Sequence, residues 1–101
     1  MGYYTYFQLE VIIGESSLVD YKKEISEASG YEYGVFDDQV KWYDFKQEME
    51  EYSRKHPDAV FLIKGVGEEQ PDLWHAYFKN GKSQMCPAEI SYDKFDESKL
   101  E

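Results

Sequence analysis

The sequence predicts a single α+β domain, in which an antiparallel sheet carries two helices on one face. Three observations support this prediction. Apolar residues alternate along the first segment, two later segments have apolar residues at helical spacing, and an Asn-Gly pair separates two strand-like runs. A chain of 101 residues, 42% of them hydrophobic, is long enough for one core and too short for two.

The first segments predict a strand and then a helix. Residues 3–13 alternate between apolar and polar side chains, as a half-buried strand does. A helix is predicted over 17–29, because Ser17 and Asp20 resemble a capping box and Gly30 is a typical residue at a helix end. The apolar residues at helical spacing are Leu18, Tyr21, Ile25 and Ala28.

The middle of the chain predicts two short strands, a second helix and a third strand. Aromatic and β-branched residues indicate strands at 31–36 and 39–43. Asp44 is a suitable N-cap for a helix that ends near residue 55, before a His-Pro pair. Residues 59–67 are nearly all apolar at first, which favours a central strand.

Residues 73–86 predict a hairpin. Asn80-Gly81 is the strongest short hairpin signal, since a type I′ turn requires positive φ at both central positions. Pro87 lacks an N–H group, so the last strand should be an edge strand or bend there. The side chains that should face the core are Trp74, Ala76, Phe78 and Met85.

The predicted order is β-α-β-β-α-β followed by a hairpin. The first six elements match the ferredoxin-like pattern, an antiparallel sheet with two helices on one face. We expect one domain over residues 1–92, including the C-terminal hairpin, and a charged tail over 93–101.

Charge and cysteine content restrict the function classes. Twenty-one acidic residues against eleven basic ones give a formal net charge of −10, which disfavours direct binding to nucleic acid or to an anionic membrane. The same charge favours a basic protein partner. One cysteine excludes an internal disulfide, and no secretory leader or membrane span is evident, so a cytoplasmic location is predicted.

Candidate catalytic chemistry is limited to one pair. The predicted hairpin register places His75 opposite Cys86, where a thiol and a base could meet. No obvious third residue completes a catalytic set, so an ordinary cross-strand pair is the preferred interpretation and no catalytic residue is predicted. No window matches a Ca²⁺ loop, and no metal site or cofactor is expected.

Acidic residues are the preferred candidates for contact with a partner. On each of the two predicted helices, acidic residues share one face at helical spacing, about 5–6 Å apart, which could imitate the phosphates of a nucleic-acid strand. A solvated helix face is the alternative interpretation. The residues predicted to bind the partner are Asp37, Asp38, Glu48, Glu51, Glu68 and Glu69.

Residues 40–82 resemble small acidic proteins encoded by phages and other mobile elements, and are more remotely similar to the YubB-type ferredoxin-like domain. The matching features are "KWYD" before a helix, "HPDAVF" leading into a strand, a Gly-Glu-Glu loop and "W..YFKNGK". The resemblance implies the fold more than an activity. It also implies a role in phage–host conflict, where small acidic proteins, anti-CRISPR proteins among them, disable nucleic-acid-binding defence enzymes.

The sequence therefore predicts a non-catalytic acidic binding module whose partner is a basic protein, such as a host nuclease or another nucleic-acid-binding protein. Two alternatives stay open. One is a small enzyme that uses Cys86 and His75. The other is a structural or self-assembling protein, in which an uncovered sheet edge pairs two copies as a homodimer.

Overall fold

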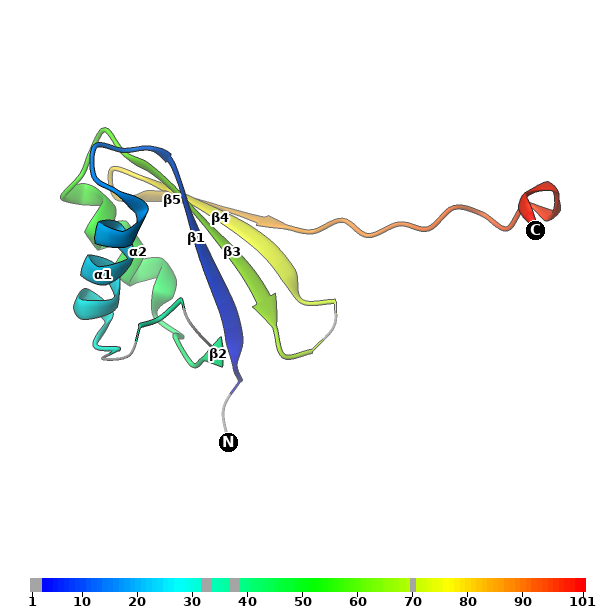
Figure 1. Cartoon of the computed structure of the whole chain (residues 1–101), viewed down its shortest axis with the longest axis horizontal. Helices are drawn as coiled ribbons and strands as arrows, with labels where there is room; N and C mark the ends of the chain where they lie inside the picture. Colours follow the sequence, from blue (N-terminus) through cyan, green and yellow to red (C-terminus); the bar gives the residue numbers. More distant parts are fainter. Residues whose placement is uncertain (1–2, 32–33, 37–38, 70) are drawn as a thin grey trace.

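The computed structural model describes residues 3–31, 34–36, 39–69 and 71–101. It is an α+β structure with two α-helices and a five-stranded antiparallel sheet in the order β2-β1-β3-β4-β5 (Figure 1). The elements along the chain are β1 (Thr5–Ile13), α1 (Leu18–Ser29), β2 (Gln39–Val40), α2 (Phe45–Arg54), β3 (Val60–Gly67), β4 (Leu73–Lys79), β5 (Lys82–Pro87) and a short 3₁₀ turn, η1 (Glu97–Lys99).

Both helices pack on the same face of the sheet, and the opposite face is open (Figure 1). The core lies between the helices and the sheet, because alternate side chains of each strand point toward the helices. The buried residues that the three long strands supply to this core are Phe7, Leu9, Phe61, Ile63, Ala76 and Phe78. We call the other side of the sheet the open face.

Local signals at the helix ends predicted the helices well. α1 is confirmed: the Ser17 hydroxyl accepts a hydrogen bond from the Asp20 N–H at 3.1 Å, and Gly30 has φ +80°. α2 is also confirmed, and Asp44 occupies its N-cap position. The Asp44 side chain makes no capping hydrogen bond, however, so the predicted role of its carboxylate is wrong.

The strands at 59–67 and 73–86 also agree with the sequence. β3 lies at the centre of the sheet, and β5 is an edge strand that ends at Pro87. β4 and β5 pair antiparallel across a two-residue turn, in which Asn80 has φ +47° and Gly81 has φ +79°. Positive φ at both positions is the requirement of a type I′ turn.

The predicted strand at 31–36 is not present among the described residues 31 and 34–36. The N–H of Val35 donates to the Ser26 hydroxyl at 3.0 Å, so this backbone group is used by a helix side chain instead of a neighbouring strand. Val35 and Phe36 are both buried, although they are adjacent in the sequence. A strand in a sheet with one covered face would bury only one of the two, because its side chains alternate.

The ferredoxin-like β-α-β-β-α-β order with an appended hairpin is consequently not confirmed. The predicted strand at 39–43 is reduced to β2, which covers only residues 39–40 and pairs with the start of β1. The long strands of the sheet follow the order β1-β3-β4-β5, and three of them are consecutive in the chain.

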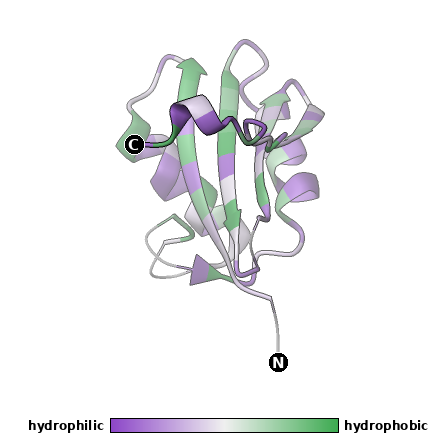
Figure 2. Ribbon diagram, turned by 90° about the vertical axis from the view of Figure 1, so that its right-hand side faces the viewer, coloured by the Kyte–Doolittle hydropathy of each residue, from purple (hydrophilic) through white to green (hydrophobic). Residues whose placement is uncertain are grey.

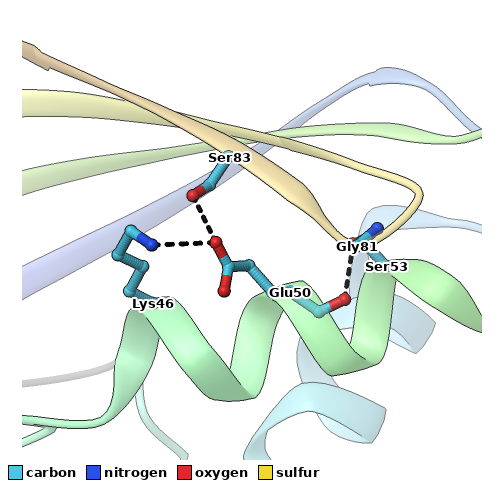
Figure 3. A network of polar contacts seen from close by, with 5 residues as sticks. All are labelled: Lys46, Glu50, Ser53, Gly81 and Ser83. Atoms are coloured by element: carbon cyan, nitrogen blue, oxygen red, sulfur yellow. Dashed lines mark hydrogen bonds and ion pairs between the residues drawn. The ribbon is translucent and has the colours of Figure 1, made fainter.

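A polar latch joins α2 to the turn between β4 and β5 (Figure 3). The buried Ser53 hydroxyl accepts a hydrogen bond from the Gly81 N–H at 2.8 Å and donates to the Glu50 carbonyl at 2.8 Å. The Glu50 carboxylate accepts from the Ser83 hydroxyl at 2.5 Å and from the Lys46 ammonium at 2.9 Å. The two contacts made by Gly81 and Ser83 hold the edge of the sheet against α2, and the other two lie within the helix.

Residues 88–101 leave the body as an extended arm that ends in η1 (Figure 1). Figure 2 views the sheet from the side toward which this arm projects. The arm accounts for the elongated shape of the chain, whose principal extents are 55 × 35 × 21 Å.

Candidate functional site: an acidic, tyrosine-rich end of the sheet

One end of the sheet brings together segments that are far apart in the sequence. Thr5, near the start of β1, pairs with Val40 of β2 on one side and with Gly67 at the end of β3 on the other. At the same end Val66 pairs with Leu73, the first residue of β4. The loop between β3 and β4 and the segment before α2 therefore lie at a common end of the sheet.

Tyr3 links these two segments through its backbone N–H and its side-chain hydroxyl. Its backbone N–H donates to the Tyr43 hydroxyl at 2.7 Å, and its own hydroxyl donates to the Asp72 carboxylate at 2.6 Å. The same hydroxyl accepts a hydrogen bond from the Glu69 N–H at 3.0 Å. A Cβ atom at Gly67 would overlap both the Asp72 carboxylate and the Tyr3 hydroxyl, so glycine permits their close approach.

The hydrogen bond to the Asp72 carboxylate raises the pKa of Tyr3 above its usual value, because the protonated phenol is the donor in this pair. The backbone hydrogen bond from Glu69 acts in the opposite direction and is the smaller effect. The two hydrogen bonds of the hydroxyl attach the loop to the start of the chain.

Acidic and aromatic side chains are exposed together at this end. Tyr43 is 64% exposed and Tyr4 is 40% exposed, and the Lys41 ammonium lies 4.8 Å from the Tyr4 ring centroid. Exposed carboxylates lie in the segment before α2 and in the loop between β3 and β4. We define the acidic end as Tyr3, Tyr4, Tyr43, Asp44, Glu68, Glu69 and Asp72.

The predicted contact residues fall into three groups. Glu68 and Glu69 are exposed and belong to the acidic end. Glu48 is half-buried and accepts a hydrogen bond from the Trp42 indole N–H at 3.0 Å, so it supports the core beside this end. Glu51 is exposed one turn further along α2, where it accepts from the Gln47 amide at 3.4 Å. The remaining two residues, Asp37 and Asp38, lie outside the described residues.

Sequence reasoning did not select Tyr3, Tyr43 or Asp72. Tyr3 and Asp72 are 69 positions apart, so nothing local in the sequence connects them. From the sequence, Tyr3 belongs to a predicted strand and Asp72 to an acidic loop with Glu68 and Glu69, and neither is selected as a contact residue. The available signal in the sequence was Gly67, because a glycine within a strand often marks a place where another group approaches the backbone closely.

His75 and Cys86 lie directly opposite each other on the open face, as the hairpin register predicted. His75 is exposed and Cys86 is half-buried. Both line a shallow groove of about 440 Å³, together with Lys64, Val66 and Leu73. No hydrogen bond joins the imidazole to the thiol among the described contacts, and the residues at the acidic end do not line this groove.

A second group of titratable side chains lies at the opposite end of the sheet. The Glu24 carboxylate accepts a hydrogen bond from the Tyr52 hydroxyl at 3.3 Å and lies 3.8 Å from the His56 Nε2 atom. Burial, and then the adjacent Glu24 charge, raises the pKa of Tyr52. This group joins α1 to α2 and packs on Phe61, which makes it part of the core.

Comparison with protein-family models, curated proteins and solved structures gives no match to this chain. Within the described ranges, no three His, Cys, Asp or Glu side chains gather closely enough to hold a metal ion. Neither of the described α-helices is long and apolar enough to cross a membrane.

Proposed function

We propose that this protein is a non-catalytic binding protein that docks its acidic end onto a basic protein partner. The observation that supports the proposal is the grouping of four exposed carboxylates, Asp44, Glu68, Glu69 and Asp72, with exposed tyrosine rings. Tyrosine rings supply contact area at small entropic cost, and carboxylates pair with Lys and Arg of a partner. The net charge of −10 would steer the encounter.

The hydrogen bonds of Tyr3 favour binding because they order the surface in advance. Its hydroxyl holds the β3–β4 loop through Asp72 and the Glu69 N–H, and its own N–H holds Tyr43. A loop that is already ordered loses less conformational entropy when a partner docks. The entropy cost of ordering the loop then cancels less of the favourable free energy of the ionic contacts.

The partner we propose is a nucleic-acid-binding protein, such as a host defence nuclease. A groove built for phosphates presents Lys and Arg side chains, which also pair with closely spaced carboxylates. The resemblance of residues 40–82 to small acidic phage proteins supports an inhibitory role of the anti-CRISPR type. Such an inhibitor would occupy the groove in the cytoplasm without contacting nucleic acid itself.

Charge reversal at the acidic end tests the proposal. Tagged protein would be used to retain partners from a bacterial lysate, and the affinity for any basic protein retained would be measured by calorimetry. We expect the double variant Glu68→Lys/Glu69→Lys to weaken binding at least about tenfold, as the loss of two central ionic contacts does.

The matched control is Glu15→Lys/Asp58→Lys, which changes the net charge equally at the opposite end of the sheet, where both residues are exposed. This control should bind about as well as the unmodified protein. Equal losses in the two double variants would show that only net charge matters. That outcome, or the retention of no basic protein, would refute docking through the acidic end.

A further inference from the structure

The C-terminal arm exposes large apolar side chains. Among its residues, Ile90 is 48% exposed, Tyr92 91%, Phe95 80% and Leu100 65%. An arm that projects from the body with aromatic rings in water is unfavourable by itself, and exposed apolar groups of this kind mark interaction sites. The arm also carries five carboxylates against two lysines, so its charge is negative.

The open face offers a groove of complementary character. It is the shallow groove lined by Lys64, Val66, Leu73, His75 and Cys86. Lys64 lies opposite His75, and the next pair on this face is Val66 opposite Leu73. Val66 is 43% exposed and Leu73 is 41% exposed, so a basic pair adjoins an apolar pair on an uncovered surface.

The arm and the groove also match in spacing. In an extended chain, residues two positions apart share a face and lie about 6.6 Å apart. Asp93 and Phe95 are two positions apart on the arm. The groove has the same step, from Lys64 to Val66 on β3 and from His75 to Leu73 on β4. A carboxylate can therefore meet the basic pair while a phenyl ring covers the apolar pair.

The arm does not cover the groove of its own molecule, whose Val66 and Leu73 stay exposed. The Ala88 N–H donates to the Leu73 carbonyl at 2.9 Å, which fixes the root of the arm at the groove, whose lining includes Pro87 and Ala88. From there the arm continues away from the body (Figure 1). Residues 88–96 make no turn or bend, so the exposed side chains of the arm lie away from this groove.

We propose that the arm of one copy docks in the groove of a second copy. The Phe95 ring covers Val66 and Leu73 of that copy, and the Asp93 carboxylate approaches Lys64 and His75. A two-fold axis repeats the contact, so that two arms and two grooves form a symmetric dimer. Lys64 already pairs with Glu10 of its own chain at 2.8 Å, and Asp93 shares this ammonium. The dimer uses the open face and does not depend on the acidic end.

The mass of the full chain in solution, measured by sedimentation equilibrium over a range of concentrations, tests the dimer. Phe95→Ala removes the arm contact at an exposed position, and Leu73→Asp places a carboxylate in the groove against an acidic arm. Each variant should raise the dissociation constant of the dimer at least about tenfold. Tyr43→Ala, which removes an exposed ring at the acidic end, should leave it unchanged.

Mixing the two variants distinguishes exchange between copies from a contact within one copy. Each heterodimer of Phe95→Ala with Leu73→Asp keeps one intact arm and one intact groove, so association should partly return when the two are mixed. If Leu73→Asp does not fold, as judged by circular dichroism, Val66→Asp serves as the groove variant. A full chain that stays monomeric, a Phe95→Ala variant that dimerises normally, or no recovery on mixing would overturn the proposal.

Discussion

Gly65 shows how one residue position determines the packing of the core. It lies directly opposite Trp74 in the β3–β4 register, and a Cβ atom there would overlap the indole ring. That ring stacks on Phe45 of α2, with centroids 4.8 Å apart. We expect Gly65→Ala to lower the free energy of unfolding by about 2 kcal/mol, because the partly buried ring, stacked on Phe45, must shift. Urea denaturation followed by circular dichroism measures this loss.

The control for this substitution is a double-mutant cycle. If the overlap with the ring is the cause, Gly65→Ala should cost much less in a Trp74→Leu background, where the ring is gone. Equal costs in both backgrounds would assign the effect to the backbone of β3 instead. The two glycines in "KGVG" therefore have packing roles in a strand, at Gly65 for the indole and at Gly67 for Tyr3 and Asp72.

Cys86 provides the test of the catalytic alternative at the scale of single residues. A non-catalytic protein needs no activated nucleophile, so the thiol should react with iodoacetamide near pH 7 at the rate of an ordinary cysteine. His75→Gln should leave that rate unchanged. The reaction would be followed by mass spectrometry at low protein concentration, where the groove is free. Fast alkylation that His75→Gln abolishes would instead support the enzyme hypothesis.

At the scale of elements, the latch between α2 and the β4–β5 turn predicts a pH dependence of stability. The Ser83 hydroxyl, and then the Lys46 ammonium, lower the pKa of Glu50 by hydrogen bonding to its carboxylate. The ionised form is thus favoured in the folded state relative to the unfolded chain. Its contribution to stability is present above the ordinary glutamate pKa and is lost as the pH falls through the lowered value.

Glu50→Gln should therefore destabilise the protein at pH 7, and this difference from the unmodified chain should shrink below about pH 4. Urea denaturation at both pH values measures the two differences. Glu51→Gln is the matched control, because Glu51 is the exposed neighbour on the same helix and should show little change at either pH. A loss in Glu50→Gln that is the same at both pH values would contradict the assigned role of the carboxylate.

The elements that the sequence predicted well are those with local signals. The Ser17 cap and Gly30 bound α1, and Asn80-Gly81 determines the register of β4 with β5. The segment at 31–36 lacked such a signal and had only a composition typical of strands. Its backbone is instead fixed by the Ser26 side chain, which is a tertiary contact. Composition alone could not distinguish a buried loop from a strand.

At the scale of the whole molecule, the strand not found at the described part of 31–36 leaves the ferredoxin-like order unconfirmed. β1 pairs with β2 over two residues and with β3 over nearly its whole length. The class of the fold and the central place of β3 were predictable from periodicity, whereas the strand order was not. The acidic end was predictable in part. Glu68 and Glu69 directly follow a strand that periodicity identifies, whereas Tyr3 meets this loop only because the sheet brings β1 beside β3.

The distribution of charge over the whole molecule predicts that its two proposed contacts respond differently to salt. Docking of the acidic end relies on ionic pairs and long-range steering, and the screening length falls from about 10 Å at 0.1 M salt to about 3 Å at 1 M. Its affinity for a basic partner should therefore fall steeply with added NaCl, and less steeply for Glu68→Lys/Glu69→Lys. The arm contact combines one carboxylate with a buried phenyl ring, so the dimer should weaken much less. Calorimetry and sedimentation over the same salt series compare the two, and parallel salt dependences would contradict the assignment of separate surfaces.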